Sequence, residues 1–385
     1  RATAGQPLKL AFDIETRHFE FSFKHDPAVT APTEIFVPSY HYHVGLAVEV
    51  SDGRCEYDEA TQILTYYHTD HQDTHTIRLF REHGPAEVLT GRITLSDGES
   101  LPLEHRYLKA NGLTFHVVMA GPADGEPVLL LHGFPEFWYG WKYQIPYLVR
   151  QGYRVIAPDQ RGYNLSDKPP HVKDYHPDLL AADVVALLDV LGYDQVKIVG
   201  HDWGALAAWW AAAQYPERFE KVVVLNVPHP TIGAEHLQSN LRQMLRSWYI
   251  GAFQIPLLPE RMMRLADWRS LKNKIHDYLG LPDTFTAEDL AQYERAWNRP
   301  HAMRSMVNWY RAIMRYRPEL ENPVIRPPLL MIWGAKDKAL GREMVRPSIE
   351  RYTAEGELVF IEEGTHWIQH DEPERVNGYI GRFFA

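Results

Sequence analysis

Asp202 lies at the tip of a predicted strand-to-helix turn, within the segment "KIVGHDWGALAAWW" of residues 197–210. A turn of this kind holds its tip residue in a strained backbone conformation, and Gly200 and Gly204 are the small neighbours that it requires. The tip residue of such turns is usually a serine, which attacks acyl groups. A carboxylate is already anionic, so it can displace a leaving group from a saturated carbon without a base. In isolation Asp202 would more often be a helix N-cap, and the functional interpretation therefore depends on the groups around it.

A histidine and a second aspartate follow in the chain order of nucleophile, acid and histidine. His366 comes after the last predicted strand, in "VFIEEGTHWIQHDEP", and Asp337 directly follows the strand "PLLMIWG". The preceding strand ends in Asn226, which carries no charge, so Asp337 is the stronger candidate for the acid. In such a triad the acid holds the imidazole tautomer and stabilises the imidazolium form of a general base.

Main-chain amides for an oxyanion hole are predicted at "HGFPE", where another strand ends. The turn after this strand places amides where the amide that follows Asp202 points, so the N–H groups of Phe134 and Trp203 are the expected donors. The side chains of Phe134, Trp138 and Trp203 are expected to contact the substrate.

Two tyrosines lie in a helical insertion of about 100 residues between "LNVPHP" and "PPLLMIWG". Tyr249 in "RSWYIGAFQIP" and Tyr310 in "MVNWYRAIM" each follow a tryptophan on a helical segment. An insertion at this point covers the carboxyl edge of the sheet, where open α/β sheets bind ligands. The chain has 21 tyrosines, and spacing alone leaves open that both are ordinary core residues.

Together "HGFPE", "GHDWGA", "WYIGAFQ", "NWYR", an Asp after the strand "PLLMIWG" and "GTHW" resemble the epoxide hydrolases of the α/β-hydrolase fold, over residues 100–385. The resemblance implies that Asp202 opens an epoxide and forms a covalent alkyl ester. It further implies that His366 and Asp337 activate the water that hydrolyses this ester to a vicinal diol. We expect no cofactor and no metal in this reaction.

The leaving group separates this activity from that of the haloalkane dehalogenases, which share the fold and the aspartate nucleophile. Epoxide opening releases an alkoxide, and the resemblance implies that Tyr249 and Tyr310 protonate it as phenols with a pKa of about 10. A halide needs N–H donors and no proton, and Trp138, Trp203 and the lid tryptophans could serve as those donors. Haloalkane dehalogenation is therefore the alternative, while "HGFPE" and the paired tyrosines favour the epoxide.

The elements that must position these groups begin near residue 113, where continuous apolar runs replace alternating ones. The runs "LTFHVVMA", "PVLLLHG", "YRVIAPD", "VKIVG", "KVVVLN", "PLLMIWG" and "ELVFIE" predict strands buried on both faces, which is typical of a mainly parallel sheet covered by helices. We predict an α/β-hydrolase core at residues 113–230 and 326–385, with a helical lid at 231–325. The charged segment 91–112 is predicted to be a connector.

Residues 1–90 alternate polar and apolar side chains in short runs, which predicts a small antiparallel β-sandwich. The segments "TEIFVPSYHYHVGLAVEVSDG" and "TQILTYYHTDHQDTHTIRLF" resemble the carboxy-terminal β-sandwich domain of endoglycoceramidase-type glycoside hydrolases. This resemblance carries no catalytic residues. A glycan-binding module is the alternative function for the domain, beside a structural or assembly role.

Five histidines of this domain raise the question of a zinc site, since imidazoles are common zinc ligands. They are His41 and His43 in "YHYH", and His68, His71 and His75 in "HTDHQDTH". Polar strands of this kind are usually solvated faces, so no metal is predicted.

The bulk composition limits the partners of the protein. A net charge of −10 argues against nucleic acid or an anionic membrane, which bind basic faces. No apolar run of about 18 residues predicts a membrane span. A single cysteine, Cys55, allows no intrachain disulfide and favours a cytoplasmic location. Met262, Met263, Met306 and the lid aromatics predict an apolar pocket, so a small apolar epoxide and water are the expected partners, and a homodimer is left open.

Overall fold

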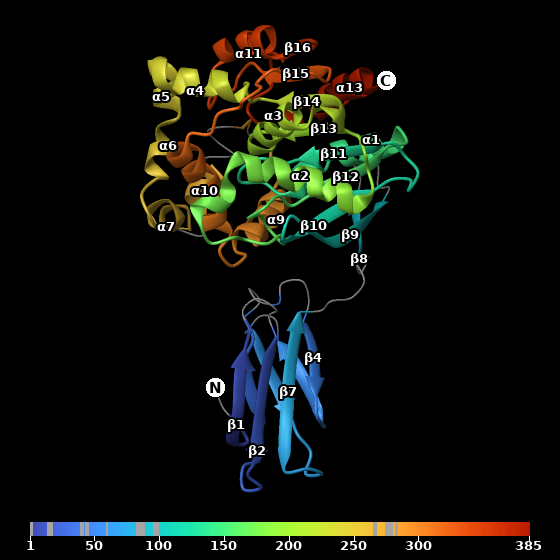
Figure 1. The fold of residues 1–385 in the computed structure, drawn as a ribbon, viewed down its shortest axis with the longest axis vertical. Helices are drawn as coiled ribbons and strands as arrows, with labels where there is room; N and C mark the ends of the chain where they lie inside the picture. Colours follow the sequence, from blue (N-terminus) through green and yellow to red (C-terminus); the bar gives the residue numbers. More distant parts are fainter. Residues whose placement is uncertain are drawn as a thin grey trace. The chain divides into compact units, whose positions relative to one another are not determined.

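The computed structural model describes residues 3–13, 18–38, 42, 46–58, 61–81, 89–94, 100–264, 268–273, 280–281 and 284–385. The chain divides into two compact units, Arg1–Ala86 and Glu87–Ala385 (Figure 1). Each unit has a hydrophobic core of its own.

The amino-terminal unit is an antiparallel β-sandwich, as predicted. One sheet has the strand order β1-β2-β7-β4 and the other β3-β6-β5, and the described strands pair in antiparallel fashion. Phe23 and Ile77 of the first sheet and Tyr66 of the second share one core, because alternate residues of a strand face the same side. The strands are β1 (Gly5–Phe12), β2 (Phe19–His25), β3 (Thr33–Phe36), β4 (Leu46–Val50), β5 (Arg54–Asp58), β6 (Ile63–Tyr67) and β7 (Thr74–Arg81).

The second unit is built on a sheet of nine strands in the order β16-β15-β14-β13-β11-β12-β10-β9-β8 (Figure 1). The strands from β16 to β12 in this order run parallel, and β10, β9 and β8 extend the sheet through antiparallel pairs. The seven strands predicted from apolar runs are confirmed, and every residue of β13 and β15 is buried. The strands are β8 (Leu89–Thr94), β9 (Ser100–Ala110), β10 (Leu113–Ala120), β11 (Pro127–Leu131), β12 (Arg154–Pro158), β13 (Val196–His201), β14 (Phe219–Leu225), β15 (Leu329–Gly334) and β16 (Gly356–Ile361).

The prediction of a connector at residues 91–112 is wrong, because β8 and β9 occupy most of this segment. β9 pairs with β8 on one side and with β10 on the other. The charged residues of β9 suggested a connector, but they form ion pairs within the sheet. Arg154 of β12 donates to Glu104 of β9 across 2.8 Å. The antiparallel edge of a sheet tolerates charged residues, since one face of these strands can meet solvent. The α/β unit therefore begins near Glu87.

Helices cover both faces of the sheet. α2 and α3 pack in one buried cluster, and α1 and α13 pack in the cluster on the opposite face. α3 approaches the sheet closely because it is rich in alanine and begins with Trp203-Gly204, where a Cβ at Gly204 would lie 2.0 Å from the carbonyl oxygen of Leu131. These helices are α1 (Gln144–Arg150), α2 (Pro177–Leu191), α3 (Trp203–Gln214), α11 (Val345–Tyr352), α12 (Ile368–Asp371) and α13 (Pro373–Phe384), with 3₁₀ turns η1 (Trp138–Trp141), η2 (Val172–Tyr175), η3 (Pro216–Arg218) and η5 (Arg342–Met344).

Helices are the main regular structure in the described part of the insertion between β14 and β15, as predicted for a lid. Arg311 of α10 is buried and holds the segment after α6: it donates to the carbonyl oxygen of Phe253 across 2.9 Å and to Glu260 across 2.6 Å. None of the described helices is long and apolar enough to cross a bilayer. The lid helices are α4 (Pro230–Ser239), α5 (Leu241–Arg246), α6 (Trp248–Ala252), α7 (Leu258–Arg264), α8 (Arg269–Asn273), α9 (Ala287–Trp297) and α10 (Ala302–Tyr316).

Candidate active site

Asp202 occupies the turn between β13 and α3, with φ of 48° and ψ of −121°. A positive φ is strained for a residue that carries a Cβ, and the strained turn predicted from the sequence is present. Its neighbours must be small: a Cβ at Gly200 would lie 2.6 Å from Cα of Ala205. A Cβ at Gly133 would lie 2.4 Å from Cβ of Asp202 itself. Glycines on two adjacent turns therefore allow the carboxylate to stand at the edge of the sheet.

A main-chain donor fixes this carboxylate. The N–H group of Phe134 donates to Oδ1 of Asp202 across 2.7 Å. Trp203 is the first residue of α3, so its N–H group has no acceptor within the helix, and the helix dipole stabilises negative charge at this end. Of the two predicted oxyanion donors, the N–H group of Phe134 contacts Asp202, and the N–H group of Trp203 stays a prediction.

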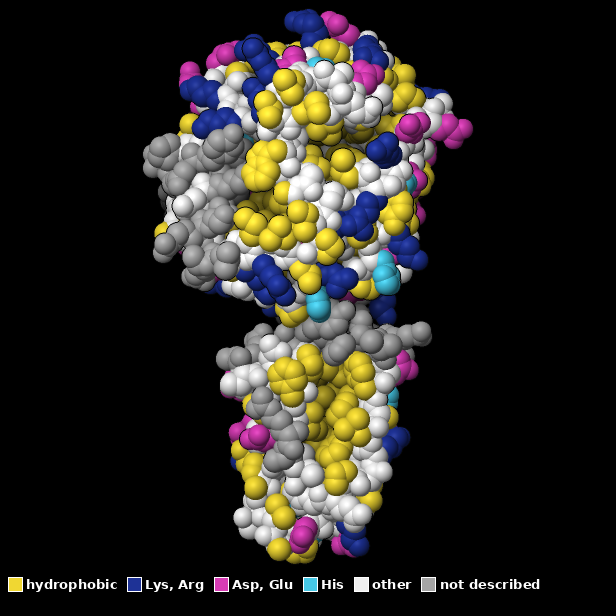
Figure 2. Space-filling model, turned by 90° about the vertical axis from the view of Figure 1, so that its left-hand side faces the viewer, with side chains coloured by type: hydrophobic (Ala, Val, Ile, Leu, Met, Phe, Trp, Pro, Cys, Tyr) yellow, Lys and Arg dark blue, Asp and Glu magenta, His cyan; other side chains and the backbone are white. Residues whose placement is uncertain are grey.

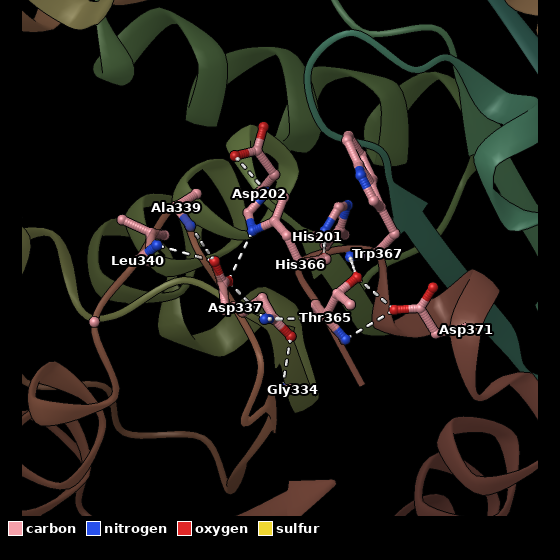
Figure 3. Close-up of polar contacts among 12 residues, drawn as sticks. His201, Asp202, Gly334, Asp337, Ala339, Leu340, Thr365, His366, Trp367 and Asp371 are labelled. Atoms are coloured by element: carbon pink, nitrogen blue, oxygen red, sulfur yellow. Dashed lines mark hydrogen bonds and ion pairs between the residues drawn. The ribbon is translucent and has the colours of Figure 1, made fainter. Parts of the chain in front are cut away.

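His366 lies between two aspartates (Figure 3). Its Nδ1 is 2.8 Å from Oδ2 of Asp337, and its Nε2 is 3.4 Å from Oδ2 of Asp202. The Nδ1–H group therefore donates to Asp337, and Nε2 faces Asp202. The three residues follow β13, β15 and β16, so the carboxyl ends of parallel strands bring them together.

Asp337 is held by more than the histidine. Its Oδ1 accepts from the N–H groups of Ala339 and Leu340, at 2.7 and 2.9 Å. Its Oδ2 accepts from the side-chain amide of Asn226 across 2.7 Å. Asn226 was expected only to be unable to supply the acid's charge, and its anchoring role was not predicted. Its place at the end of the strand next to β15 was the available signal.

A buried network behind the triad holds the main chain of His366. The Nε2–H group of His201 donates to the carbonyl oxygen of His366 across 2.8 Å. Nδ1 of the same ring is 3.2 Å from Glu136, and Nε2 of His370 is 2.7 Å from the other oxygen of that glutamate. None of these three side chains was predicted. The signal was their proximity to the motifs: Glu136 is the last residue of "HGFPE", and His201 precedes Asp202.

The charges of the triad are coupled. Burial opposes the charged form of His366, but Asp337 and Asp202 outweigh it and raise the pKa of His366 to about 10. Burial also opposes ionisation of the two carboxyl groups, and the nearby His366 outweighs it, so the pKa values of Asp202 and Asp337 are lowered. At neutral pH the site therefore holds two carboxylates and one imidazolium.

A cavity of about 490 Å³ lies over Asp202 and His366. Its walls are largely apolar, and Leu245, Trp248 and Met262 of the lid are more than half exposed at its rim. Hydrophobic side chains gather on this face of the unit (Figure 2). Met262 and Met263 line the cavity as expected, whereas Met306 is buried in the core and does not. The lining residues are Phe134, Pro135, Asp202, Leu245, Arg246, Trp248, Tyr249, Ala252, Phe253, Leu258, Pro259, Met262, Met263, Leu271, Tyr310, Lys338, Ala339, His366 and Trp367.

Both predicted tyrosines line the same cavity as Asp202. The rings of Tyr249 and Tyr310 are 5.9 Å apart between centroids, at 75° to each other. Burial raises the pKa of each hydroxyl, and the negative charge of Asp202 raises it further. Both phenols therefore keep their protons at neutral pH and can donate hydrogen bonds.

Two predicted substrate contacts need correction. Trp138 does not line the cavity, because its ring packs edge-on against His105 at 5.6 Å and against Phe137 at 5.9 Å. The Trp203 side chain lies behind the lining, where its ring contacts Tyr310 at 4.7 Å. Phe134 lines the cavity as predicted.

Comparison with known proteins relates this arrangement to a family. The family described as the alpha/beta hydrolase fold matches residues 126–259, and the glycoside hydrolase family 5 C-terminal domain matches residues 1–79. Epoxide hydrolase 4 of Mus musculus is 39% identical over 280 residues, which cover 72% of this chain and 77% of that protein. The chain belongs to the epoxide hydrolase family. Both resemblances seen in the sequence are thereby confirmed.

Two further comparisons agree with this assignment. The AB hydrolase superfamily protein YfhM of Bacillus subtilis is 43% identical over 278 residues, covering 71% of this epoxide hydrolase and 96% of that protein. The crystal structure of Bacillus megaterium epoxide hydrolase in complex with an inhibitor matches with a TM-score of 0.67 and 31% identity, over 72% of this chain and 99% of that chain. The α/β-hydrolase fold of the enzyme is thus shared with an epoxide hydrolase of known structure.

Proposed function

We propose that this epoxide hydrolase opens an apolar epoxide with Asp202 and releases a vicinal diol in two chemical steps. The observation that carries the proposal is the position of the Asp202 carboxylate. Phe134 holds one of its oxygens, His366 faces the other, and the cavity above contains two phenol donors.

In the first step the epoxide oxygen accepts hydrogen bonds from Tyr249 and Tyr310. Oδ2 of Asp202 attacks one ring carbon in line with the carbon–oxygen bond that breaks. The oxygen that leaves takes a proton from a tyrosine, and an alkyl ester of Asp202 forms. An apolar cavity strengthens the hydrogen bonds to the developing alkoxide, since little water competes for it.

In the second step water attacks the ester carbonyl carbon of Asp202. Nε2 of His366 takes a proton from this water while Asp337 holds Nδ1. Negative charge develops on Oδ1, which already accepts from Phe134. The intermediate then collapses, His366 returns the proton to the departing diol oxygen, and the carboxylate is restored.

The coupled charges supply the proton that this sequence needs. In the free enzyme His366 is an imidazolium, because Asp202 and Asp337 raise its pKa to about 10. Forming the ester removes the charge of Asp202, so the pKa of His366 falls and its proton can replace the one that the tyrosine gave to the alkoxide. His366 is then neutral when it must act as a base. Hydrolysis first leaves a carboxylic acid on Asp202, and its proton passes to His366, so the carboxylate and the imidazolium are restored together.

The cavity argues against haloalkane dehalogenation as the main activity. A halide requires indole or amide N–H donors, and of the tryptophans predicted for that role Trp138 and Trp203 lie outside the lining, whereas the lid residue Trp248 lines it. The preference for an epoxide rests on Tyr249 and Tyr310, which line the same cavity as Asp202 and can protonate an alkoxide, a step that halide release does not need.

A substrate panel tests this proposal. Apolar epoxides and haloalkanes of matched size are incubated with the enzyme, and diol and halide are both measured. Diol formation that is lost in Asp202→Asn supports the proposal. Halide release without diol formation would assign the dehalogenase activity instead.

For the amino-terminal unit we propose a structural or assembly role, because no residue proposed for catalysis comes from it, and glycan binding is the alternative. A glycan array probed with the full chain tests this choice. We also propose a cytoplasmic location, based on the single cysteine, and a homodimeric assembly.

A further inference from the structure

Three histidines of the amino-terminal unit turn their rings toward one another. His25 ends β2, His75 lies in β7, and His68 directly follows β6 of the other sheet. The ring centroids are 4.7 Å apart for His68 and His75, 5.1 Å for His25 and His75, and 5.2 Å for His25 and His68. One nitrogen of each ring lies within 4.8 Å of the others.

A partly buried carboxylate fixes the orientation of His75. Nδ1 of this fully buried ring is 2.7 Å from Oδ1 of Asp52. Tyr66 and Thr69 also donate hydrogen bonds to this carboxylate. The ionised carboxylate accepts the proton on Nδ1, so Nε2 of His75 keeps its lone pair and points into the cluster. A histidine that ligates a metal ion is commonly oriented by a carboxylate in this way.

The other two rings lack a full set of partners. Nδ1 of His25 is 2.9 Å from Nε2 of His75 and 3.1 Å from the carbonyl oxygen of Gln72, so its single proton serves two acceptors. His68 has ring contacts, but its nitrogens have no hydrogen-bond partner among the residues that the structure describes.

We propose that His25, His68 and His75 bind a divalent transition-metal ion, best matched by zinc, which ties the two sheets of the sandwich together. Three imidazole ligands suit zinc rather than magnesium or calcium, which prefer oxygen. Zinc–nitrogen bonds of about 2.0–2.1 Å place ligand nitrogens about 3.3 Å apart in a tetrahedral site. The three ligand nitrogens therefore need to approach one another by less than about 2 Å. Since His25 and His68 are only half-buried, solvent reaches the fourth coordination position of the ion.

The small size of the unit gives the ion a structural purpose. Residues 1–86 form a compact unit by themselves, and units of this size often add a metal or disulfide to a limited core. Its single cysteine, Cys55, is free. A metal ion that joins His68 to His25 and His75 would link β6 to β2 and β7 across the sandwich.

The sequence showed only part of this cluster. His68 and His75 were among the candidates, but His25 was not, because it precedes His75 by 50 residues. His71 is exposed and outside the cluster, and His41 and His43 lie outside the described residues. The proposed zinc site therefore replaces the expectation that the domain carries no metal.

The test uses the full chain without a histidine tag, stripped with a chelator and then titrated with ZnCl₂ by calorimetry. We expect one zinc ion per chain, bound with a Kd of about 1 μM or tighter near neutral pH. The midpoint of thermal unfolding of the sandwich should rise by several degrees. A wild-type Kd weaker than about 100 μM would overturn the proposal.

A matched pair of variants locates the bound ion. His68→Phe keeps an aromatic ring in the cluster but removes its nitrogens, so zinc affinity should fall at least about tenfold. His71→Phe changes an exposed histidine outside the cluster, so zinc affinity should stay at the wild-type value. Unfolding curves recorded without zinc show that both variants fold. If His68→Phe binds zinc as tightly as the wild type, for example at the triad, the assignment is wrong.

Discussion

Phe134 donates its main-chain N–H group to Oδ1 of Asp202 across 2.7 Å. The other oxygen, Oδ2, lies 3.4 Å from Nε2 of His366. The two oxygens of one carboxylate therefore have different surroundings before any substrate binds. Oδ1 is placed to carry the charge of the hydrolytic step, and Oδ2 is placed to attack, so no donor needs to move between the two steps.

The tyrosines should matter for ring opening. Changing Tyr249 or Tyr310 to Phe removes one hydroxyl and should slow alkylation of Asp202 at least about tenfold, near 1.4 kcal/mol in the barrier. Single-turnover kinetics measures this rate. Tyr316→Phe is the matched control, since Tyr316 lies on the same helix but is exposed. If both single variants alkylate Asp202 at the wild-type rate, the role assigned to the tyrosines is wrong and the dehalogenase alternative is favoured.

Asn226 should act on hydrolysis through Asp337. Asn226→Gly removes the side-chain amide while tolerating the positive φ of 54° at this position. Asp337 then loses one of its donors and orients His366 less well, so we expect deacylation to slow about tenfold with alkylation little changed. Pre-steady-state kinetics separates the two steps. An equal loss in both would mean that Asn226 serves general stability rather than the position of the acid.

The triad should make stability depend on pH. The folded-state pKa of His366 is about 10, whereas the unfolded value is about 6.5. Its stabilising contribution is therefore complete below about pH 6.5 and is lost as the pH rises toward 10. The difference in Tm between the wild type and His366→Gln should be largest near pH 6 and shrink by several degrees near pH 10. A difference that stays constant over this range would contradict the raised pKa.

A truncation pair tests the limits of the catalytic unit. A chain that starts at Glu87 keeps all nine strands of its sheet, and a chain that starts at Ser100 lacks β8. The first should hydrolyse epoxides within about twofold of the wild-type rate, because no cavity residue precedes Phe134. The second should unfold at a lower temperature, since it exposes the edge of β9. A folded first variant without turnover would show that the sandwich contributes to the site.

Much of this site could be predicted because its residues lie just after the ends of strands. Asp202, Asp337 and His366 each follow a continuous apolar run, and parallel strands of one sheet bring such positions to a common edge. The strained turn at Asp202 could be predicted from its neighbours in the sequence, because a glycine lies two residues away on each side. Tyr249 and Tyr310 depended on resemblance, because helical spacing does not distinguish a cavity wall from a core.

The rest depends on contacts between segments that sequence patterns do not join. Glu136 meets His201 across 65 residues and His370 across 234. Trp138 carries a suitable side chain near the right motif, yet its ring turns toward His105 and away from the cavity. The charges of β9 resembled those of a connector because ion pairs such as Arg154 with Glu104 form only once the sheet is assembled.

The nucleophile can be identified directly by trapping the ester. Asp202 attacks without a base, whereas hydrolysis of the ester needs His366, so His366→Gln should alkylate and then stop. Intact-protein mass spectrometry after mixing this variant with an apolar epoxide should show one added substrate mass, mapped to the peptide that contains Asp202. Asp202→Asn should show no such adduct at short times. An adduct on another residue, or none in a folded His366→Gln protein that binds the epoxide, would contradict the carboxylate nucleophile.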